Sequence, residues 1–170
     1  LPYDVYNRKE AREAVKNHPL SFLNMDRPET QFPDDTDMYD PKVYEKAKEL
    51  LKARLADHIY LTDEDQSYYL YQLTMDGQTG IVACCSIDDY VSGVIKKHEN
   101  TREEKEQDRI RHVDVMNAQT GPIFLAYRQN EVLGQIMEQV MLERPLYDFV
   151  SEDGIGHRVW KVRKAEQNQK

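Results

Sequence analysis

The stretch SYYLYQLTMDGQTGIVACCSI, residues 67–87, decides the fold class of this chain. Its first nine residues are rich in tyrosine and aliphatic side chains, which is typical of a strand. Asp76 and Gly77 form a strong hairpin turn signal. The apolar run from Thr79 to Ile87 then predicts a returning strand in the centre of a sheet. The stretch therefore predicts an antiparallel hairpin.

A second hairpin is expected near the end of the sequence. Residues 147–151 and 157–162 have strand character, and Asp153 and Gly154 lie between them as a turn signal. Two shorter segments, 21–25 and 123–127, also read as strands.

Helices are expected where polar cap residues precede apolar residues at helical spacing: Asn7 with Glu10, Asp40 before Pro41, and Asn130 mark three of these starts. The expected helices cover residues 8–17, 41–57, 88–95, 102–117 and 131–143. Thr101 with Glu104 forms a capping-box pair that sets the start of the fourth helix. Residues 26–40 are rich in Asp, Pro and Thr, and they predict a surface loop.

These elements predict an α+β fold with a mixed, largely antiparallel sheet, two hairpins and three to five packed helices. We expect the helices at 41–57, 102–117 and 131–143 to share one core. Residues 1–163 should form a single domain, which we interpret as the N-terminal part of a longer protein. Residues 164–170 should be a disordered tail.

Composition excludes several classes of protein. The chain has 170 residues with 23 Lys and Arg against 31 Asp and Glu, so its net charge is −8. This acidity argues against a general nucleic-acid coat protein. The longest uncharged run, residues 115–127, has 13 residues, which is too short to cross a bilayer. The first residues show no signal peptide. We therefore expect a cytoplasmic protein with no membrane partner, and nucleic acid is an unlikely partner.

The two cysteines, Cys84 and Cys85, are adjacent in the apolar run. Successive residues of a strand point to opposite faces. We therefore predict two reduced thiols on opposite sides of one strand, in a reducing compartment.

Residues 96–112 form a basic island in this acidic chain, with six Lys or Arg, five acids and two His. A helix that begins after Thr101 would direct free N–H groups at an anion. Lys105, Arg109 and His112 follow at i, i+4 and i+7, so they should share one helix face. The island therefore predicts a binding site for phosphate or carboxylate.

Each residue of the island receives an expected role. His98 would act as acid, base or nucleophile, with Glu99 or Asp108 as its partner. The residues expected to bind the anion are Thr101, Arg102, Lys105, Arg109 and His112. The alternative interpretation is a solvated helix face on which these charges pair with neighbouring acids. No His or Cys spacing predicts a metal site, and neither GxxxxGK[ST] nor GxGxxG is present.

A family resemblance rests on several segments. The sequence GVIKKHENTREEKEQDRIRH at 93–112, followed by NAQTGPIFLAY at 117–127, resembles the hallmark of the bacterial and archaeal domain of unknown function 1015 family. The segments LPYDV at the start, HPLSFLNMDRPE, YEKAKELL and YLYQLTMDGQTGIVACCSIDDY also resemble that family's pattern. The resemblance implies no established reaction.

The same resemblance implies a loose link to serine metabolism and to ParB-like proteins. Genes of this family often neighbour those of serine biosynthesis. ENTREEKEQ resembles the ENxQRE box of ParB-like domains, which include nucleotide hydrolases and a free-serine kinase. The GxRR box of ParB proteins is absent, and this argues against chromosome partitioning.

We therefore expect an enzyme that acts on a small phosphorylated or nucleotide-linked metabolite by phosphoryl transfer or hydrolysis. Two alternatives remain open: a non-catalytic module that binds an anion or nucleotide, and a ParB-like protein associated with nucleic acid. The residues identify neither a cofactor nor an oligomeric state.

Overall fold

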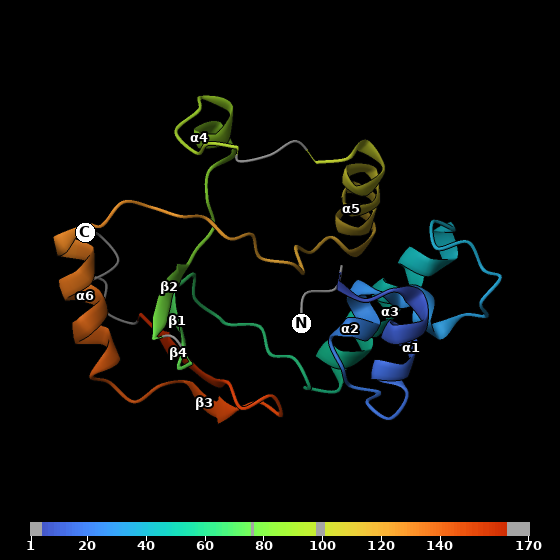
Figure 1. The fold of residues 1–170 in the computed structure, drawn as a ribbon, viewed down its shortest axis with the longest axis horizontal. Helices are drawn as coiled ribbons and strands as arrows, with labels where there is room; N and C mark the ends of the chain where they lie inside the picture. The colour runs from blue at the N-terminus through green and yellow to red at the C-terminus, as the bar shows by residue number, and fades with distance from the viewer. Residues whose placement is uncertain (1–4, 76, 98–100, 163–170) are drawn as a thin grey trace. The chain divides into compact units, whose positions relative to one another are not determined.

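The computed structural model describes residues 5–75, 77–97 and 101–162. The chain divides into two compact units, Leu1–Thr62 with His98–Phe124 (unit 1) and Asp63–Lys97 with Leu125–Lys170 (unit 2). Figure 1 shows helices alone in the first unit and a small sheet with helices in the second. The predicted α+β class is confirmed. A single domain over 1–163 stays a prediction, and the expected tail at 164–170 lies outside the described residues.

Unit 1 is helical wherever it has regular structure. Its elements are α1 (Arg8–Val15), α2 (Leu23–Asp26), the 3-10 helix η2 (Pro28–Gln31), α3 (Pro41–Ala56) and α5 (Glu103–Met116). The predicted N-terminal caps of α1 and of α3, the longest helix, are both present. Asn7 and Glu10 form a reciprocal capping box at the start of α1. At the start of α3, the Asp40 side chain accepts a hydrogen bond from the backbone N–H of Lys42, and Pro41 is the first residue of the helix.

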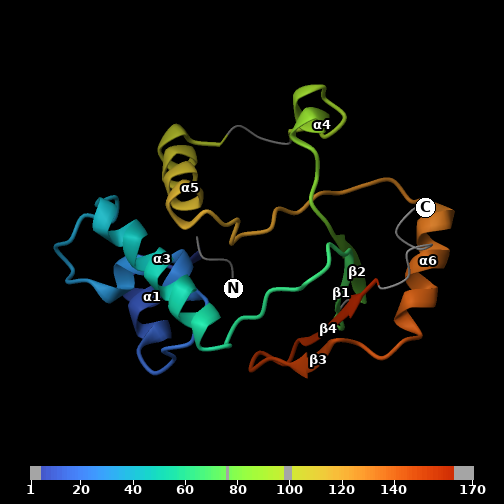
Figure 2. The same ribbon diagram turned by 180° about the vertical axis from the view of Figure 1, so that it is seen from behind.

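The core of unit 1 joins distant segments of the chain. Met25 from α2, Ala47 from α3 and Met116 from α5 are buried together. Leu50, Leu51 and Tyr60 pack around them. Figure 2 shows α3 and α5 packed side by side. Unit 1 is therefore held by side chains that lie far apart in the sequence.

Unit 2 contains a four-stranded antiparallel sheet in the order β2-β1-β4-β3. Its elements are β1 (Tyr69–Leu73), β2 (Gln78–Val82), α4 (Ile87–Val91), α6 (Glu131–Met141), β3 (Tyr147–Val150) and β4 (Gly156–Lys161). Both predicted hairpins are confirmed, because β1 pairs with β2 and β3 pairs with β4, each antiparallel. Gly77 and Gly154 have φ of +65° and +81°, which glycine adopts without strain.

The core of unit 2 lies between one face of the sheet and α6. Leu70 stands opposite both Ile81 and Trp160 in the strand register, so these three side chains share a face. Val140 of α6 is 2% exposed and packs on this face, together with Val162. The expectation of one shared core is therefore wrong: α3 and α5 bury a different cluster from α6.

Three strand expectations are also wrong. The returning strand β2 ends at Val82 and lies at the sheet edge, because β4 takes the other side of β1. Residues 21–25 contribute instead to α2, and residues 123–127 have no regular structure. Residues 26–40 are partly helical, since they include η2. Short apolar runs do not distinguish a strand from a buried helical turn.

Cys84 and Cys85 follow β2 rather than lying in it, so their predicted placement on one strand is wrong. Both are free and exposed thiols, and no disulfide joins them. Within the described ranges, no helix combines the length and apolar character that a membrane crossing requires.

Candidate functional site

A partly open pocket of about 100 Å³ lies in unit 1. Its walls come from five segments: Tyr6 ahead of the α1 cap, the α2–η2 turn, Met38 in the loop before α3, the start of α3 and one face of α5. The lining residues are Tyr6, Asp26, Arg27, Pro28, Glu29, Met38, Val43, Tyr44, Lys105, Asp108, Arg109 and His112. This volume accommodates several water molecules, and it is below the roughly 300 to 1,000 Å³ of sites for drug-sized ligands. The pocket therefore suits a small ligand, or one group of a larger ligand.

Four residues of α5 line this pocket. Lys105, Asp108, Arg109 and His112 lie at i, i+3, i+4 and i+7, which places them on one face of a helix. The structure thus brings together three of the residues that were expected to bind an anion. The core residue Met116 continues the buried side of the same helix.

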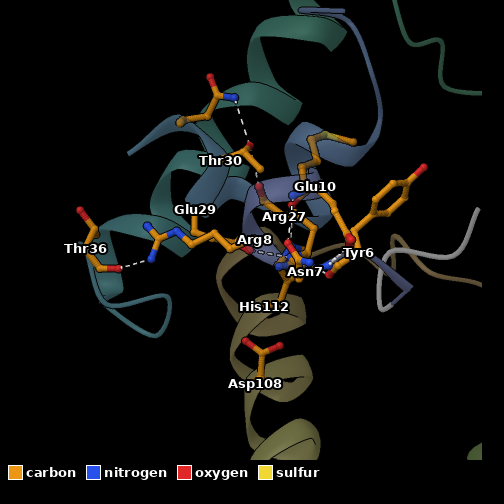
Figure 3. A network of polar contacts seen from close by, with 12 residues as sticks. Tyr6, Asn7, Arg8, Glu10, Arg27, Glu29, Thr30, Thr36, Asp108 and His112 are labelled. Atoms are coloured by element: carbon orange, nitrogen blue, oxygen red, sulfur yellow. Dashed lines mark hydrogen bonds and ion pairs between the residues drawn. The ribbon is translucent and has the colours of Figure 1, made fainter. Parts of the chain in front are cut away.

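The wall opposite α5 is fixed by a buried ion pair. The Arg27 guanidinium donates to the Glu29 carboxylate across 2.5 Å and to the Tyr6 carbonyl across 2.6 Å. Glu29 is only 3% exposed, so water screens this pair weakly. Figure 3 shows this network, with Asp108 and His112 projecting from α5. The pair neutralises its own charges, and the Asp26 carboxylate beside it is the charge that this wall retains.

Asp108 organises the middle of the α5 face. It is 8% exposed, accepts a 2.9 Å hydrogen bond from the Tyr44 hydroxyl, and accepts two bonds from Arg109 at 2.8 and 3.0 Å. Burial raises the pKa of Tyr44, and the bond to Asp108 raises it further. Tyr44 therefore stays a neutral donor, and Asp108 holds the Arg109 side chain in one orientation at the pocket.

His112 lies deepest on this face, with 1% of its surface exposed. Its Nε2 is 2.9 Å from the Met25 carbonyl oxygen. Because a carbonyl only accepts, Nε2 must carry the hydrogen. Burial lowers the pKa of His112, and the positive charge of Arg109 lowers it as well. The hydrogen bond to the Met25 carbonyl raises the pKa and offsets part of this decrease. The ring is therefore neutral at pH 7.

Lowering the pH is expected to weaken the fold through His112. The unfolded side chain takes up a proton near its ordinary pKa of 6.5, whereas the folded side chain does so only at lower pH. The contribution of neutral His112 to the free energy of unfolding is therefore complete above about pH 6.5. It is lost as the pH falls toward the pKa of His112 in the folded state. Urea unfolding of the wild type and of His112→Gln, at several pH values between about 5 and 8, measures this contribution. The difference in unfolding free energy should shrink at low pH, and a constant difference would contradict the expectation.

The expected start of α5 requires a correction, and the anion-binding role of Thr101 stays a prediction. The N-cap of α5 is Arg102, which makes no side-chain capping bond, so the Thr101–Glu104 capping box is not formed. Glu103, Glu104 and Glu106 occupy the first turn, and their negative charges already balance the helix dipole there. Position 101 is therefore not the helix terminus.

The other expected residues separate into three groups. Arg102 does not line the pocket; its side chain is 80% exposed and pairs with Glu104 at 3.7 Å, as on a solvated face. His98 and Glu99 lie outside the described residues, so their catalytic roles stay predictions. Lys105, Arg109 and His112 remain as the part of the predicted site that the pocket includes.

Eight of the twelve residues that line the pocket were not expected from the sequence. Tyr44 belongs to the apolar stripe of α3, and nothing in its spacing indicates a bond to Asp108, which is 64 positions away. Arg27 and Glu29 were assigned to a surface loop, although they form a buried pair. Among the described residues, no group of three His, Cys, Asp or Glu is arranged to hold a metal ion.

A comparison with protein families identifies the chain at the level of a family. The family model described as Protein of unknown function (DUF1015) matches residues 1–170, the whole length. The chain belongs to this family. No curated protein and no solved structure matches it. DUF1015 membership confirms the resemblance found in residues 93–112, and it assigns no reaction to the pocket.

Proposed function

We propose that this DUF1015 chain binds the phosphate group of a small phosphorylated or nucleotide-linked metabolite in the pocket of unit 1. The observation that carries the proposal is the state of Lys105. Its ammonium makes no hydrogen bond or ion pair with the described residues, although it lies at the edge of a pocket. A cation in that position is available to a ligand.

The acids of the pocket support an anionic ligand, because each already has a partner. Glu29 pairs with Arg27, Asp108 with Arg109, and Asp26 accepts a 2.9 Å hydrogen bond from the Thr120 hydroxyl. Arg27 and Arg109 each pair with an acid, so Lys105 is the pocket cation that has no acidic partner among the described residues. Arg109, oriented by Asp108, supplies a second positive group on the same face of α5.

Removing the cations of this face is expected to weaken binding of phosphate esters. Lys105→Gln and Arg109→Ala should each cost about 1.5 to 3 kcal/mol, the range for hydrogen bonds to charged groups. Calorimetric titration with inorganic phosphate, ethyl phosphate and ATP measures the loss. Lys48→Ala is the matched control, because Lys48 pairs with Glu45 on α3 and does not line the pocket. Equal affinities for all variants would contradict the proposal.

Binding and catalysis are separable in the same samples. A hydrolase would release inorganic phosphate from a bound ester or from ATP, and a phosphoryl-transfer enzyme would form a new phosphate ester with a supplied acceptor alcohol. In either case His98→Ala would reduce the rate while leaving Lys105-dependent binding intact. A non-catalytic module would bind the same compounds and release nothing. The ParB-like alternative would instead require binding to DNA that weakens steeply with salt.

The proposal places the chain in the cytoplasm. Its support is the pair of free thiols at Cys84 and Cys85, which a reducing compartment preserves.

A further inference from the structure

The outermost strand of the sheet in unit 2 is exposed along its whole length. In the strand order β2-β1-β4-β3, β3 has a neighbour on one side only. All four of its residues are exposed, and three of them are the large apolar side chains Tyr147, Phe149 and Val150, at 54%, 53% and 70%. An exposed apolar edge strand is a template for pairing with another strand, because its outward N–H and C=O groups are free. We therefore examine which strand β3 would fit.

The hydrogen bonds of the hairpin show which backbone groups of β3 reach the open edge. The Ser151 amide donates to the Ile155 carbonyl oxygen, on the β4 side of the hairpin, at 2.9 Å. Because this direction alternates along an antiparallel strand, Phe149 also directs its backbone groups toward β4. Asp148 and Val150 therefore direct their N–H and C=O groups to the open edge, where the described residues place no further strand.

One symmetric register pairs all of these outward groups with one another. A two-fold axis at Phe149 places Asp148 of each copy opposite Val150 of the other, and each such pair exchanges two backbone hydrogen bonds. An axis at Asp148 would place two carboxylates directly opposite each other. An axis at Val150 would place Asp148 opposite Glu152 of the second copy. Like charges directly opposite are destabilising, so the strand is complementary to itself in the register centred on Phe149.

We infer that two copies of this chain associate through β3, antiparallel and in the register centred on Phe149, so that their four-stranded sheets join into one. The two Phe149 rings then pack against each other and remove apolar area that a single chain leaves in water. A strand of four residues buries less than the roughly 1,200 Å² of a stable interface, so this dimer is weak and forms at high protein concentration.

Sedimentation equilibrium of the full 170-residue chain tests the inference at concentrations up to about 1 mM. The apparent mass should rise toward that of a dimer. Phe149→Lys places two ammonium groups opposite each other at the axis and should raise the dissociation constant at least about tenfold. Val150→Pro removes an N–H that faces the edge, keeps the bonds to β4, and should have a similar effect. The matched control is Phe124→Lys, at an aromatic side chain 81% exposed outside the sheet, which should change nothing.

Cysteine cross-linking tests the register, in a chain whose own Cys84 and Cys85 are replaced by serine. Phe149→Cys should form a disulfide-linked dimer on mild oxidation, because Cα atoms directly opposite in a non-hydrogen-bonded pair lie about 4.5 Å apart. Tyr147→Cys should not, because its two copies lie four residues apart along the paired strands, about 14 Å.

The results that would overturn the inference are specific. A chain that stays monomeric at every concentration has no such interface. A dimer that neither Phe149→Lys nor Val150→Pro weakens is formed by another surface. Cross-linking of Tyr147→Cys as efficient as that of Phe149→Cys contradicts the register. The cross-linking comparison still decides the question if one of the other variants does not fold.

Discussion

Replacing Arg54 with alanine is expected to lower the free energy of unfolding by about 3 to 5 kcal/mol. Arg54 is 3% exposed. Its guanidinium donates to the carbonyl oxygens of Pro19 and Ser21 at 2.9 and 3.1 Å and to the Tyr60 hydroxyl at 2.7 Å. Alanine would leave these three oxygens without their donor and a cavity beside α3. Urea unfolding of the purified chain measures the change.

Two further variants isolate the cause. Arg54→Lys should fall between the wild type and Arg54→Ala, because one ammonium cannot reproduce the planar fork that reaches three oxygens. Lys52→Ala, two positions earlier on the exposed side of α3, should change stability by less than about 0.5 kcal/mol. An effect of Arg54→Ala as small as that of Lys52→Ala would show that this network contributes little.

Replacing Trp160 with alanine is expected to have an effect of similar size on unit 2, about 3 to 5 kcal/mol. The indole is 5% exposed and packs in the cluster of Leu70, Val140 and Val162. Its Nε1–H also donates to the Glu143 carbonyl oxygen at 3.0 Å. The substitution removes the largest side chain of this core, together with the bond that ties β4 to the end of α6.

The measurement is thermal or urea unfolding followed by a probe in the sheet. Trp160→Phe should lose only about 1 to 2 kcal/mol, because it keeps most of the apolar volume and loses the N–H donor. Arg158→Ala serves as the surface control on the same strand, since its ion pair with Asp148 is exposed and contributes at most about 1 kcal/mol. Similar losses for Trp160→Ala and Arg158→Ala would contradict the assignment of Trp160 to the core.

The sequence by itself predicted the elements whose signals are local. The Asn7–Glu10 box, the Asp40–Pro41 start and the Asn130 cap all place helices correctly, because a cap is formed by side chains within one turn of the helix end. Both hairpins follow from two-residue turn signals for the same reason. The shared face of Lys105, Arg109 and His112 also follows from spacing alone.

Only the tertiary structure decided which of these elements pack together. The sequence predicted one core, whereas α3 with α5 and the sheet with α6 bury two separate clusters. It predicted β2 in the centre, whereas β4, from the end of the chain, takes that place beside β1. The pocket also depends on contacts between distant segments, because the Tyr44 hydroxyl donates a hydrogen bond to Asp108, 64 positions further along the chain. A turn or a cap is decided by a few neighbouring residues, but a packing partner is chosen by the apolar area and hydrogen bonds that become available only when distant segments meet.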